Sequence, residues 1–187
     1  MKLVPNALSL ARIFLTPFFV ILFFEGTYKS LVYAFILFTI AALTDMYDGY
    51  IARKYNVISS LGTFLDPLAD KVLVTVAFSC FIFYGFVSWW MVGIILSRDI
   101  LVTFMRLWLI KHGMTLQTSF LAKYKTASQF GALYIMFLVV LYTKKHGIPV
   151  NDCGVTVLYV MMCGVVILTT YSALKYCINF WRVLQKK

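Results

Sequence analysis

The sequence predicts an all-α membrane protein that crosses the bilayer about six times. Of its 187 residues, 62% are hydrophobic, and the mean hydropathy is +0.88, values typical of a membrane protein and not of a soluble one. The chain holds about six apolar runs close to the roughly 20 residues that a helix needs to cross a bilayer. The breaks between these runs are too short for a soluble domain, so we expect a single transmembrane domain over residues 1–187.

Each predicted span is an apolar run that ends at a turn or charge signal. In chain order the spans are Leu8–Phe24, Leu31–Arg53, Leu61–Gly85, Trp89–Lys111, Phe120–Thr143 and Gly154–Tyr176. Pro5 precedes the first span, at a position where proline is tolerated. The breaks contain Glu25 with Gly26, the segment 54–60, the segment 85–88, His112 with Gly113, and the segment 144–152. This pattern predicts helices joined by short connections.

The distribution of lysine and arginine predicts the orientation of the spans. With six spans, one side of the membrane carries Lys2, Arg12, Arg53, Lys54, Lys111, Lys123, Lys125, Arg182, Lys186 and Lys187, and the other carries Lys29, Lys144 and Lys145. Because cytoplasmic loops carry the excess of basic residues, we expect both termini and the active site on the cytoplasmic side of the cell (inner) membrane. This topology and attraction to anionic membrane lipids account for the net charge of +10. Nucleic acid is not an expected partner, since the basic residues are scattered over helix ends.

Four of the seven acidic residues lie in one stretch of the chain. Asp45 and Asp48 are three residues apart, and Asp66 and Asp70 are four apart, so each pair shares a face of a helix. An ionised carboxylate inside a bilayer costs about 2.5–3.5 kcal/mol, and carboxylates close together also repel one another. Two divalent cations would compensate, and oxygen ligands favour Mg²⁺, Mn²⁺ or Ca²⁺. Paired ions of this kind serve phosphoryl chemistry, so we expect a lipid that carries a diphosphate as the ligand.

Two glycines and one arginine accompany these carboxylates. Gly49 follows Asp48, and Gly62 lies one turn before Asp66, so both leave room for a ligand to approach closely. The same glycines suit close packing of neighbouring helices, and each can serve both purposes. Arg53, one turn after Gly49, can bind a phosphate through its planar guanidinium. Its alternative role is that of an ordinary basic residue at the cytoplasmic end of a span.

At this spacing the acidic stretch resembles the signature of the CDP-alcohol phosphotransferase family. The fixed positions that agree are Asp45, Asp48, Gly49, Ala52, Arg53, Gly62, Asp66 and Asp70. The resemblance implies six transmembrane helices, a homodimer and two bound divalent cations, Mg²⁺ or Mn²⁺. It also implies an enzyme that transfers a phosphatidyl group from CDP-diacylglycerol, or a related group, to an alcohol and releases CMP.

The resemblance also assigns roles to individual residues. Asp45, Asp48 and Asp66 would hold the first metal ion, and Asp66 with Asp70 would hold the second. Asp70 would in addition be the general base that takes the proton of the acceptor hydroxyl. The residues expected to contact the CDP-lipid are Asn6, Gly49, Arg53, Ser59 and Gly62. Ser59 has an alternative role as the N-cap of the third span, although the next residue is as well placed.

Most of the chain up to about residue 130 resembles family members that use glycerol 3-phosphate as the acceptor and make phosphatidylglycerophosphate. The likeness rests on Arg12, Arg106 and the runs Pro5-Asn6, Asp48 to Lys54, Phe64 to Lys71, Arg98-Asp99 and Lys123 to Thr126. The last span is unspecific. The resemblance therefore implies that CDP-diacylglycerol and glycerol 3-phosphate are the two substrates.

Four basic residues form the predicted binding site for the acceptor phosphate: Arg98, Arg106, Lys123 and Lys125. Arg98 and Arg106 are eight residues apart on the fourth span and so share a face. Arginines that deep in a span need an anion or a cavity. In the alternative interpretation, Asp99 pairs with Arg106 and the lysines meet lipid headgroups.

Other acceptors and another class of protein are the remaining alternatives. The other acceptors are phosphatidylglycerol, which would give cardiolipin, inositol phosphate and serine. A transporter or channel is the alternative class, because intramembrane carboxylates also mark ion paths. The carboxylates gather at one membrane face, and no pair of spans looks like an inverted repeat, which favours the enzyme.

Overall fold

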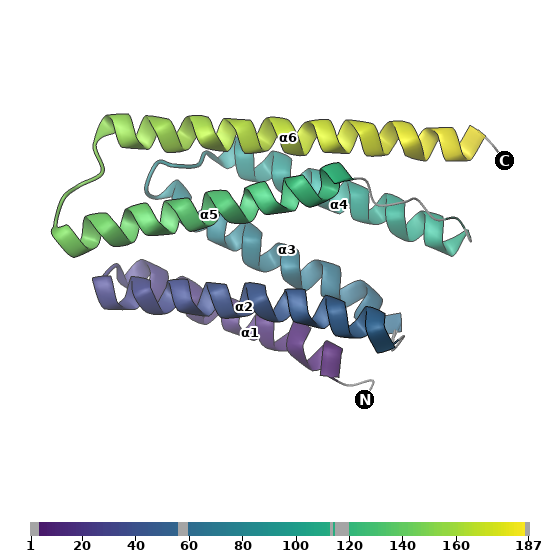
Figure 1. Cartoon of the computed structure of the whole chain (residues 1–187), viewed down its shortest axis with the longest axis horizontal. Helices are drawn as coiled ribbons and strands as arrows, with labels where there is room; N and C mark the ends of the chain where they lie inside the picture. The colour runs from purple at the N-terminus through teal and green to yellow at the C-terminus, as the bar shows by residue number, and fades with distance from the viewer. Residues whose placement is uncertain (1–3, 56–59, 113, 115–119, 186–187) are drawn as a thin grey trace. The chain divides into compact units, whose positions relative to one another are not determined.

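In the computed structural model, the described part of the chain comprises residues 4–55, 60–112, 114 and 120–185, with side chains described for 12–44, 71–112, 114 and 124–185. This part forms six α-helices and contains no strand (Figure 1). The helices are α1 (Val4–Glu25), α2 (Tyr28–Tyr55), α3 (Ser60–Ile82), α4 (Trp89–Lys111), α5 (Phe120–His146) and α6 (Asp152–Gln185). Each predicted span corresponds to one helix, which confirms the predicted all-α fold.

Two of the predicted breaks are helix ends at glycine. Gly26 follows α1 with φ +70°, and Gly147 follows α5 with φ +67°. This left-handed conformation costs little in the absence of a Cβ atom, so glycine commonly terminates a helix. The last helix extends beyond its predicted end at Tyr176 to Gln185. It does so because the sequence after Gly164 contains no glycine or proline to stop it.

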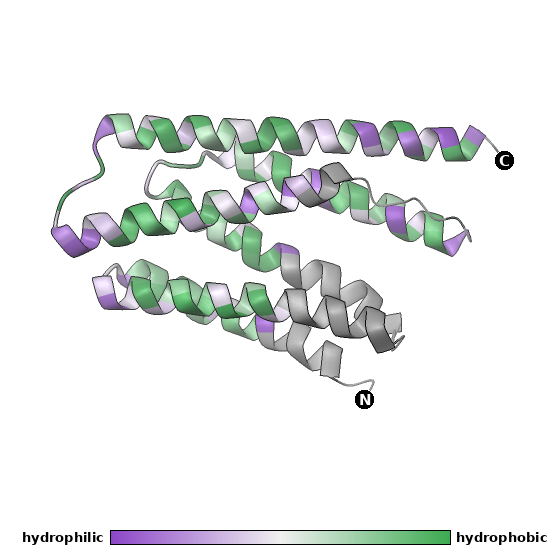
Figure 2. Cartoon of the chain, in the orientation of Figure 1, coloured by the Kyte–Doolittle hydropathy of each residue, from purple (hydrophilic) through white to green (hydrophobic). Residues whose placement is uncertain are grey.

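Two helices are long and apolar enough to cross a membrane, among the residues whose side chains are described. They are the stretch Tyr124–His146 of α5 and the helix α6. Shorter apolar stretches are Tyr28–Thr44 and Lys71–Ile82. Figure 2 shows hydrophobic residues along much of α6 and hydrophilic residues toward its C-terminal end. These helices support a membrane location, and the number of six crossings stays a prediction.

The helices form two compact units. The first unit combines Met1–Cys80 with Phe137–Val150, and the second combines Phe81–Met136 with Asn151–Lys187. The aspartate-rich stretch belongs to the first unit. The basic residues predicted to bind the acceptor phosphate all belong to the second unit.

An aromatic cluster around Phe137 forms the core of the first unit, where α1 packs against α2. The ring centroid of Phe137, on α5, lies 6.0 Å from those of Phe19 and Phe23 on α1. It lies 5.6 Å from the ring of Phe38 and 5.5 Å from the ring of Phe35, both on α2. These tilted and edge-to-face arrangements are the ones that aromatic pairs favour. The cluster therefore joins the C-terminal part of α5 to α1 and α2.

In the second unit, α4 and α6 pack side by side and run in the same direction (Figure 1). Their contacts join residues 71 to 74 positions apart along the chain: Ser88 with Tyr159, Arg98 with Ser172, Met105 with Cys177, and Trp108 with Phe180. A nearly constant offset indicates a parallel pair, because an antiparallel pair would keep the sum of the residue numbers constant. The contacts also define which residues of α4 and α6 lie at the same level.

We expect Phe137→Ala to destabilise the protein, because it empties the centre of the aromatic cluster. Removal of a buried phenylalanine ring costs about 3–5 kcal/mol in soluble proteins. In a bilayer the lost packing remains while the apolar transfer term becomes small, so we expect roughly 2 kcal/mol. Thermal unfolding in detergent measures the effect, with Leu138→Ala as the matched control because Leu138 is 57% exposed. Equal loss of stability in both variants would contradict the prediction.

Candidate functional site

The four predicted metal ligands lie on two consecutive helices of the first unit. Asp45 and Asp48 are within α2, and Asp66 and Asp70 are within α3. Each pair is separated by about one helical turn, roughly 4.5–6 Å along the helix axis. Asp48 lies seven residues before the end of α2, and Asp66 lies six residues after the start of α3. The two pairs are therefore at similar distances from the segment that connects the helices.

The side chains of these aspartates lie outside the described residues, and so do the predicted contacts to the CDP-lipid: Asn6, Gly49, Arg53, Ser59 and Gly62. Among the side chains that are described, no group of three or more His, Cys, Asp or Glu residues could hold a metal ion. The predicted donor set itself fits hard cations, because it consists of carboxylate oxygens only. The metal site stays a prediction.

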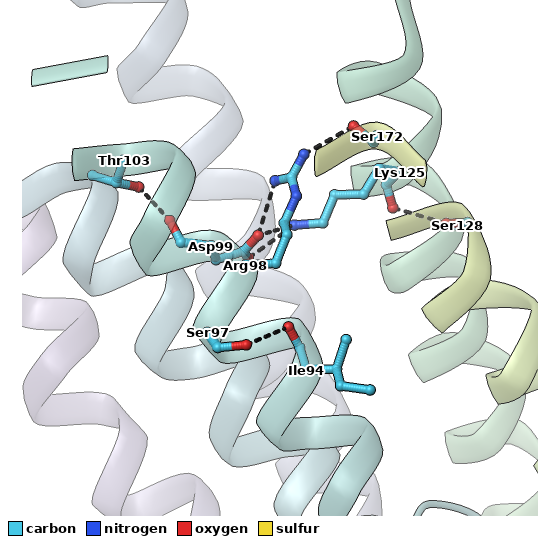
Figure 3. A network of polar contacts seen from close by, with 8 residues as sticks. All are labelled: Ile94, Ser97, Arg98, Asp99, Thr103, Lys125, Ser128 and Ser172. Carbon is cyan, nitrogen blue, oxygen red and sulfur yellow. Dashed lines mark hydrogen bonds and ion pairs between the residues drawn. The ribbon is translucent and has the colours of Figure 1, made fainter. Parts of the chain in front are cut away.

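A buried network of charged side chains joins α4, α5 and α6 in the second unit (Figure 3). Nζ of Lys125 donates hydrogen bonds to both carboxylate oxygens of Asp99, at 2.6 and 2.8 Å. Nη1 of Arg98 donates to Oδ1 of Asp99 at 3.0 Å, and Nη2 of Arg98 donates to Oγ of Ser172 at 2.9 Å. Asp99 is 8% exposed, and Lys125 and Ser172 are 5% and 4% exposed. The network therefore lies in the interior of the unit.

Local helix geometry directs Arg98 and Asp99 to different neighbours. Successive residues of an α-helix point about 100° apart. Asp99 therefore reaches Lys125 on α5, while Arg98 reaches Ser172 on α6 (Figure 3). The hydroxyl of Thr103 donates to the backbone carbonyl of Asp99 at 2.6 Å. Arg98 also donates to Asp99, so the carboxylate of Asp99 binds one cation from α4 and one, Lys125, from α5.

Among the described side chains, Asp99 is the carboxylate that both Arg98 and Lys125 contact. Removing a charged group from water costs several kcal/mol, and hydrogen-bonded partners of opposite charge must compensate. Two cations from neighbouring helices that meet at one place also suit an anionic ligand, because a phosphate group accepts hydrogen bonds from both arginine and lysine.

Of the four predicted phosphate-binding residues, the structure brings two together. Asp99 joins Arg98 and Lys125. Arg106 is exposed on α4, and the side chain of Lys123 lies outside the described residues. The alternative interpretation named Arg106 as the partner of Asp99, whereas the observed network pairs Asp99 with Arg98 and Lys125. The part of Arg106 and Lys123 in phosphate binding stays a prediction.

Sequence reasoning did not identify Ser172, or Asp99 as the link between the two cations. A signal for Asp99 was present, because a carboxylate beside an arginine inside an apolar run requires a partner of opposite charge. For Ser172 the sequence carries no signal, since a serine on a long apolar helix is unremarkable by itself. Its role follows from the hydrogen bond that it accepts from Arg98.

Comparison with known sequences relates nearly the whole chain to one family. The sequence model of the CDP-alcohol phosphatidyltransferase family matches residues 2–171. Three curated relatives are each named CDP-diacylglycerol–glycerol-3-phosphate 3-phosphatidyltransferase. The relative from Wigglesworthia glossinidia brevipalpis is 35% identical over 97% of this chain and 96% of its own length. The Rickettsia typhi protein is 35% identical over 97% of this chain and 100% of its own length. The Escherichia coli K12 protein is 33% identical over 92% of this chain and 92% of its own length.

We expect Asp99→Asn to destabilise the protein by about 3 kcal/mol, because it removes the carboxylate that binds Arg98 and the buried Lys125. The double variant Asp99→Asn/Lys125→Met removes one of these cations and should recover part of the loss. Denaturant unfolding in detergent measures both effects. Asp152→Asn, at the exposed start of α6, is the matched control. A double variant no more stable than Asp99→Asn would contradict the role given to the charge balance.

Proposed function

The chain belongs to the CDP-alcohol phosphatidyltransferase family, and from this premise we propose that it transfers the phosphatidyl group of CDP-diacylglycerol to glycerol 3-phosphate. One observation carries the proposal. Relatives that are 33–35% identical over at least 92% of both chains bear the name of this reaction. The products are phosphatidylglycerophosphate, which serves phospholipid biosynthesis, and CMP. The family match over residues 2–171 supports one domain for the whole chain.

The reaction exchanges one phosphorus–oxygen bond for another. A hydroxyl oxygen of glycerol 3-phosphate attacks the phosphorus that bears the diacylglycerol, and the bond from this phosphorus to the CMP oxygen breaks. CMP leaves with the bonding electrons, and the hydroxyl proton passes to a carboxylate, for which we assign Asp70. Positioning of the reactants and stabilisation of the developing charge supply most of the rate enhancement in phosphoryl transfer.

The four aspartates would hold two divalent cations, Mg²⁺ or Mn²⁺. Asp45, Asp48 and Asp66 would bind the first ion, and Asp66 with Asp70 would bind the second. Bound cations of this kind withdraw charge from phosphate oxygens and from the leaving group. The donor set supports the assignment, since it offers only oxygen ligands, one helical turn apart on two consecutive helices. Four carboxylates in apolar surroundings also need positive charge to compensate for lost hydration.

The CDP part of the lipid would bind beside the aspartates. Gly49 and Gly62 have no side chain, so they leave room for the nucleotide. Arg53 is one helical turn from Gly49 and would bind a phosphate of the lipid. Asn6 and Ser59 would complete the set as polar contacts, and the packing of α1, which carries Asn6, against α2 supports this grouping.

Arg98 and Lys125 would bind the phosphate of the acceptor. Their support is the observed network, in which Arg98 and the buried Lys125 come together at Asp99 from two helices. Arg106 and Lys123 would complete the binding site for this phosphate. Four basic residues assigned to one site favour an acceptor that carries a phosphate, such as glycerol 3-phosphate, over an uncharged polyol.

We further propose that all six helices cross the membrane, with the active site facing the cytoplasm. The apolar helices support a membrane location, and the excess of Lys and Arg on one side supports this orientation. Glycerol 3-phosphate would then arrive from the cytoplasm, while CDP-diacylglycerol enters from the bilayer. The family resemblance suggests that the functional form is a homodimer.

The purified protein in detergent, supplied with CDP-diacylglycerol, is expected to release CMP only when an acceptor is present. Glycerol 3-phosphate should be used best in a panel that also contains phosphatidylglycerol, inositol phosphate and serine. Chelation of divalent cations should stop the release, and addition of Mg²⁺ or Mn²⁺ should restore it. Mass spectrometry of the lipid product identifies the acceptor. Preference for another member of the panel would disprove glycerol 3-phosphate as the substrate.

We expect Asp70→Asn to lower the rate of CMP release by a factor of about 100 or more, because an amide cannot take the hydroxyl proton. Binding of CDP-diacylglycerol should be partly retained, since three of the four aspartates remain. Asp152→Asn makes the same chemical change at an exposed position and should leave the rate unchanged. A near-normal rate in Asp70→Asn would show that another group is the base.

A further inference from the structure

Three buried hydrogen-bond donors in the second unit have no partner in the described part of the chain. They are Nε of Arg98, Nε2 of Gln129 and Oγ1 of Thr169. Gln129 is 3% exposed and Thr169 is fully buried. Most buried polar side-chain atoms in native structures are hydrogen-bonded, and an unsatisfied one costs about 1–3 kcal/mol. Three such donors within one unit therefore point to a ligand.

The hydroxyl of Thr169 departs from the pattern that other helical threonines of this chain follow. Six of them donate to the backbone carbonyl four residues earlier: Thr16, Thr39, Thr44, Thr103, Thr156 and Thr170. This local bond is the usual way for a threonine in an apolar helix to satisfy its hydroxyl. Thr169 is more deeply buried than its neighbour Thr170, yet its hydroxyl makes no hydrogen bond. The hydroxyl therefore needs a partner outside its own helix.

The helix register places these donors beside the charged network. The offset of 71 to 74 residues between α4 and α6 puts Thr169 opposite positions 95–98 of α4, within one turn of Arg98. Gln129 lies one turn after Lys125 on α5, and both are buried, so they share a face. Because α5 and α6 run in opposite directions (Figure 1), Gln129 and Thr169 lie toward the same side of the network. The uncharged donors thus extend the site of Arg98 and Lys125.

The chemistry of these donors distinguishes two parts of one site. The cations of Arg98 and Lys125 suit a phosphate group. The amide of Gln129 and the hydroxyl of Thr169 are uncharged and suit a hydroxyl group, which must find partners when it is buried. Glycerol 3-phosphate carries a phosphate, a terminal hydroxyl that reacts and a middle hydroxyl that does not. The middle hydroxyl is the group left for the uncharged donors.

We propose that Gln129 and Thr169 bind the middle hydroxyl of glycerol 3-phosphate, with the Nε–H of Arg98 completing the donor set, and so determine the choice of acceptor. This assignment rests on the proposed function and adds two specificity-determining residues to it. A site built to hydrogen-bond a substrate hydroxyl discriminates against an analogue that lacks it, because the donors of the site are then left unpaired.

The test compares glycerol 3-phosphate with 3-hydroxypropyl phosphate, which has the same phosphate and reacting hydroxyl but lacks the middle one. We expect the wild-type protein to favour glycerol 3-phosphate in kcat/KM by about tenfold or more. Thr169→Val and Gln129→Met should each lower kcat/KM for glycerol 3-phosphate and leave that for the analogue nearly unchanged. Thr169→Ser keeps the hydroxyl and should keep most of the preference. Thr170→Val is the matched control, since the hydroxyl of Thr170 bonds its own helix.

Equilibrium binding of both acceptors, measured by calorimetry without CDP-diacylglycerol, separates the two proposals. If the wild-type protein prefers glycerol 3-phosphate in binding but releases no CMP, the proposed reaction fails and the hydroxyl site stands. If CMP release is normal but Thr169→Val keeps the full preference, the hydroxyl site is wrong and the reaction stands. An equal preference in the wild-type protein also overturns the site. Thermal unfolding shows whether each variant is folded. If Gln129→Met does not fold, the comparison of Thr169→Val with Thr169→Ser tests the hydroxyl site by itself.

Discussion

The cost of placing charged side chains among apolar helices governs how this protein is built. A charged side chain in the interior loses its hydration and is tolerated only where another group compensates. In the second unit, Asp99 accepts hydrogen bonds from Arg98 and Lys125, and Ser172 accepts one more from Arg98. These four residues come from three helices. The hydrogen bonds that compensate these charges therefore also hold α4, α5 and α6 together.

The same constraint links the chemistry of the two units. The first unit contains the four aspartates from Asp45 to Asp70, and the network of the second unit brings the cations Arg98 and Lys125 together. A protein that merely needed stability would pair such charges fully, or replace them by apolar residues. In the proposed reaction each group of charges serves binding, because the aspartates would hold divalent cations and Arg98 with Lys125 would bind the acceptor phosphate. The buried donors of Gln129 and Thr169 also need partners, and in the proposed site the middle hydroxyl of the acceptor supplies them.

Much of this protein was predictable from neighbouring residues in the chain. Apolar runs of about bilayer length predict the helices, and Gly26 and Gly147 mark two of their ends, because hydropathy and backbone freedom are local properties. The family is likewise a local signal, since its signature is contained within the stretch from Asp45 to Asp70. The extension of α6 to Gln185 was missed because hydropathy reports where a helix is apolar and not where its backbone stops.

The helices, the membrane character and the family thus follow from the order of the residues alone. The contacts of Lys125 with Asp99 and of Arg98 with Ser172 are visible only in the packed helices, and so is the missing hydrogen bond of the Thr169 hydroxyl. The first two contacts join residues 26 and 74 positions apart. They depend on the rotation and axial register of packed helices, which are set by side-chain shape and hydrogen bonds between helices. A hydropathy pattern specifies neither the rotation nor the axial register of a helix, because a helix in a bilayer can be apolar on every face.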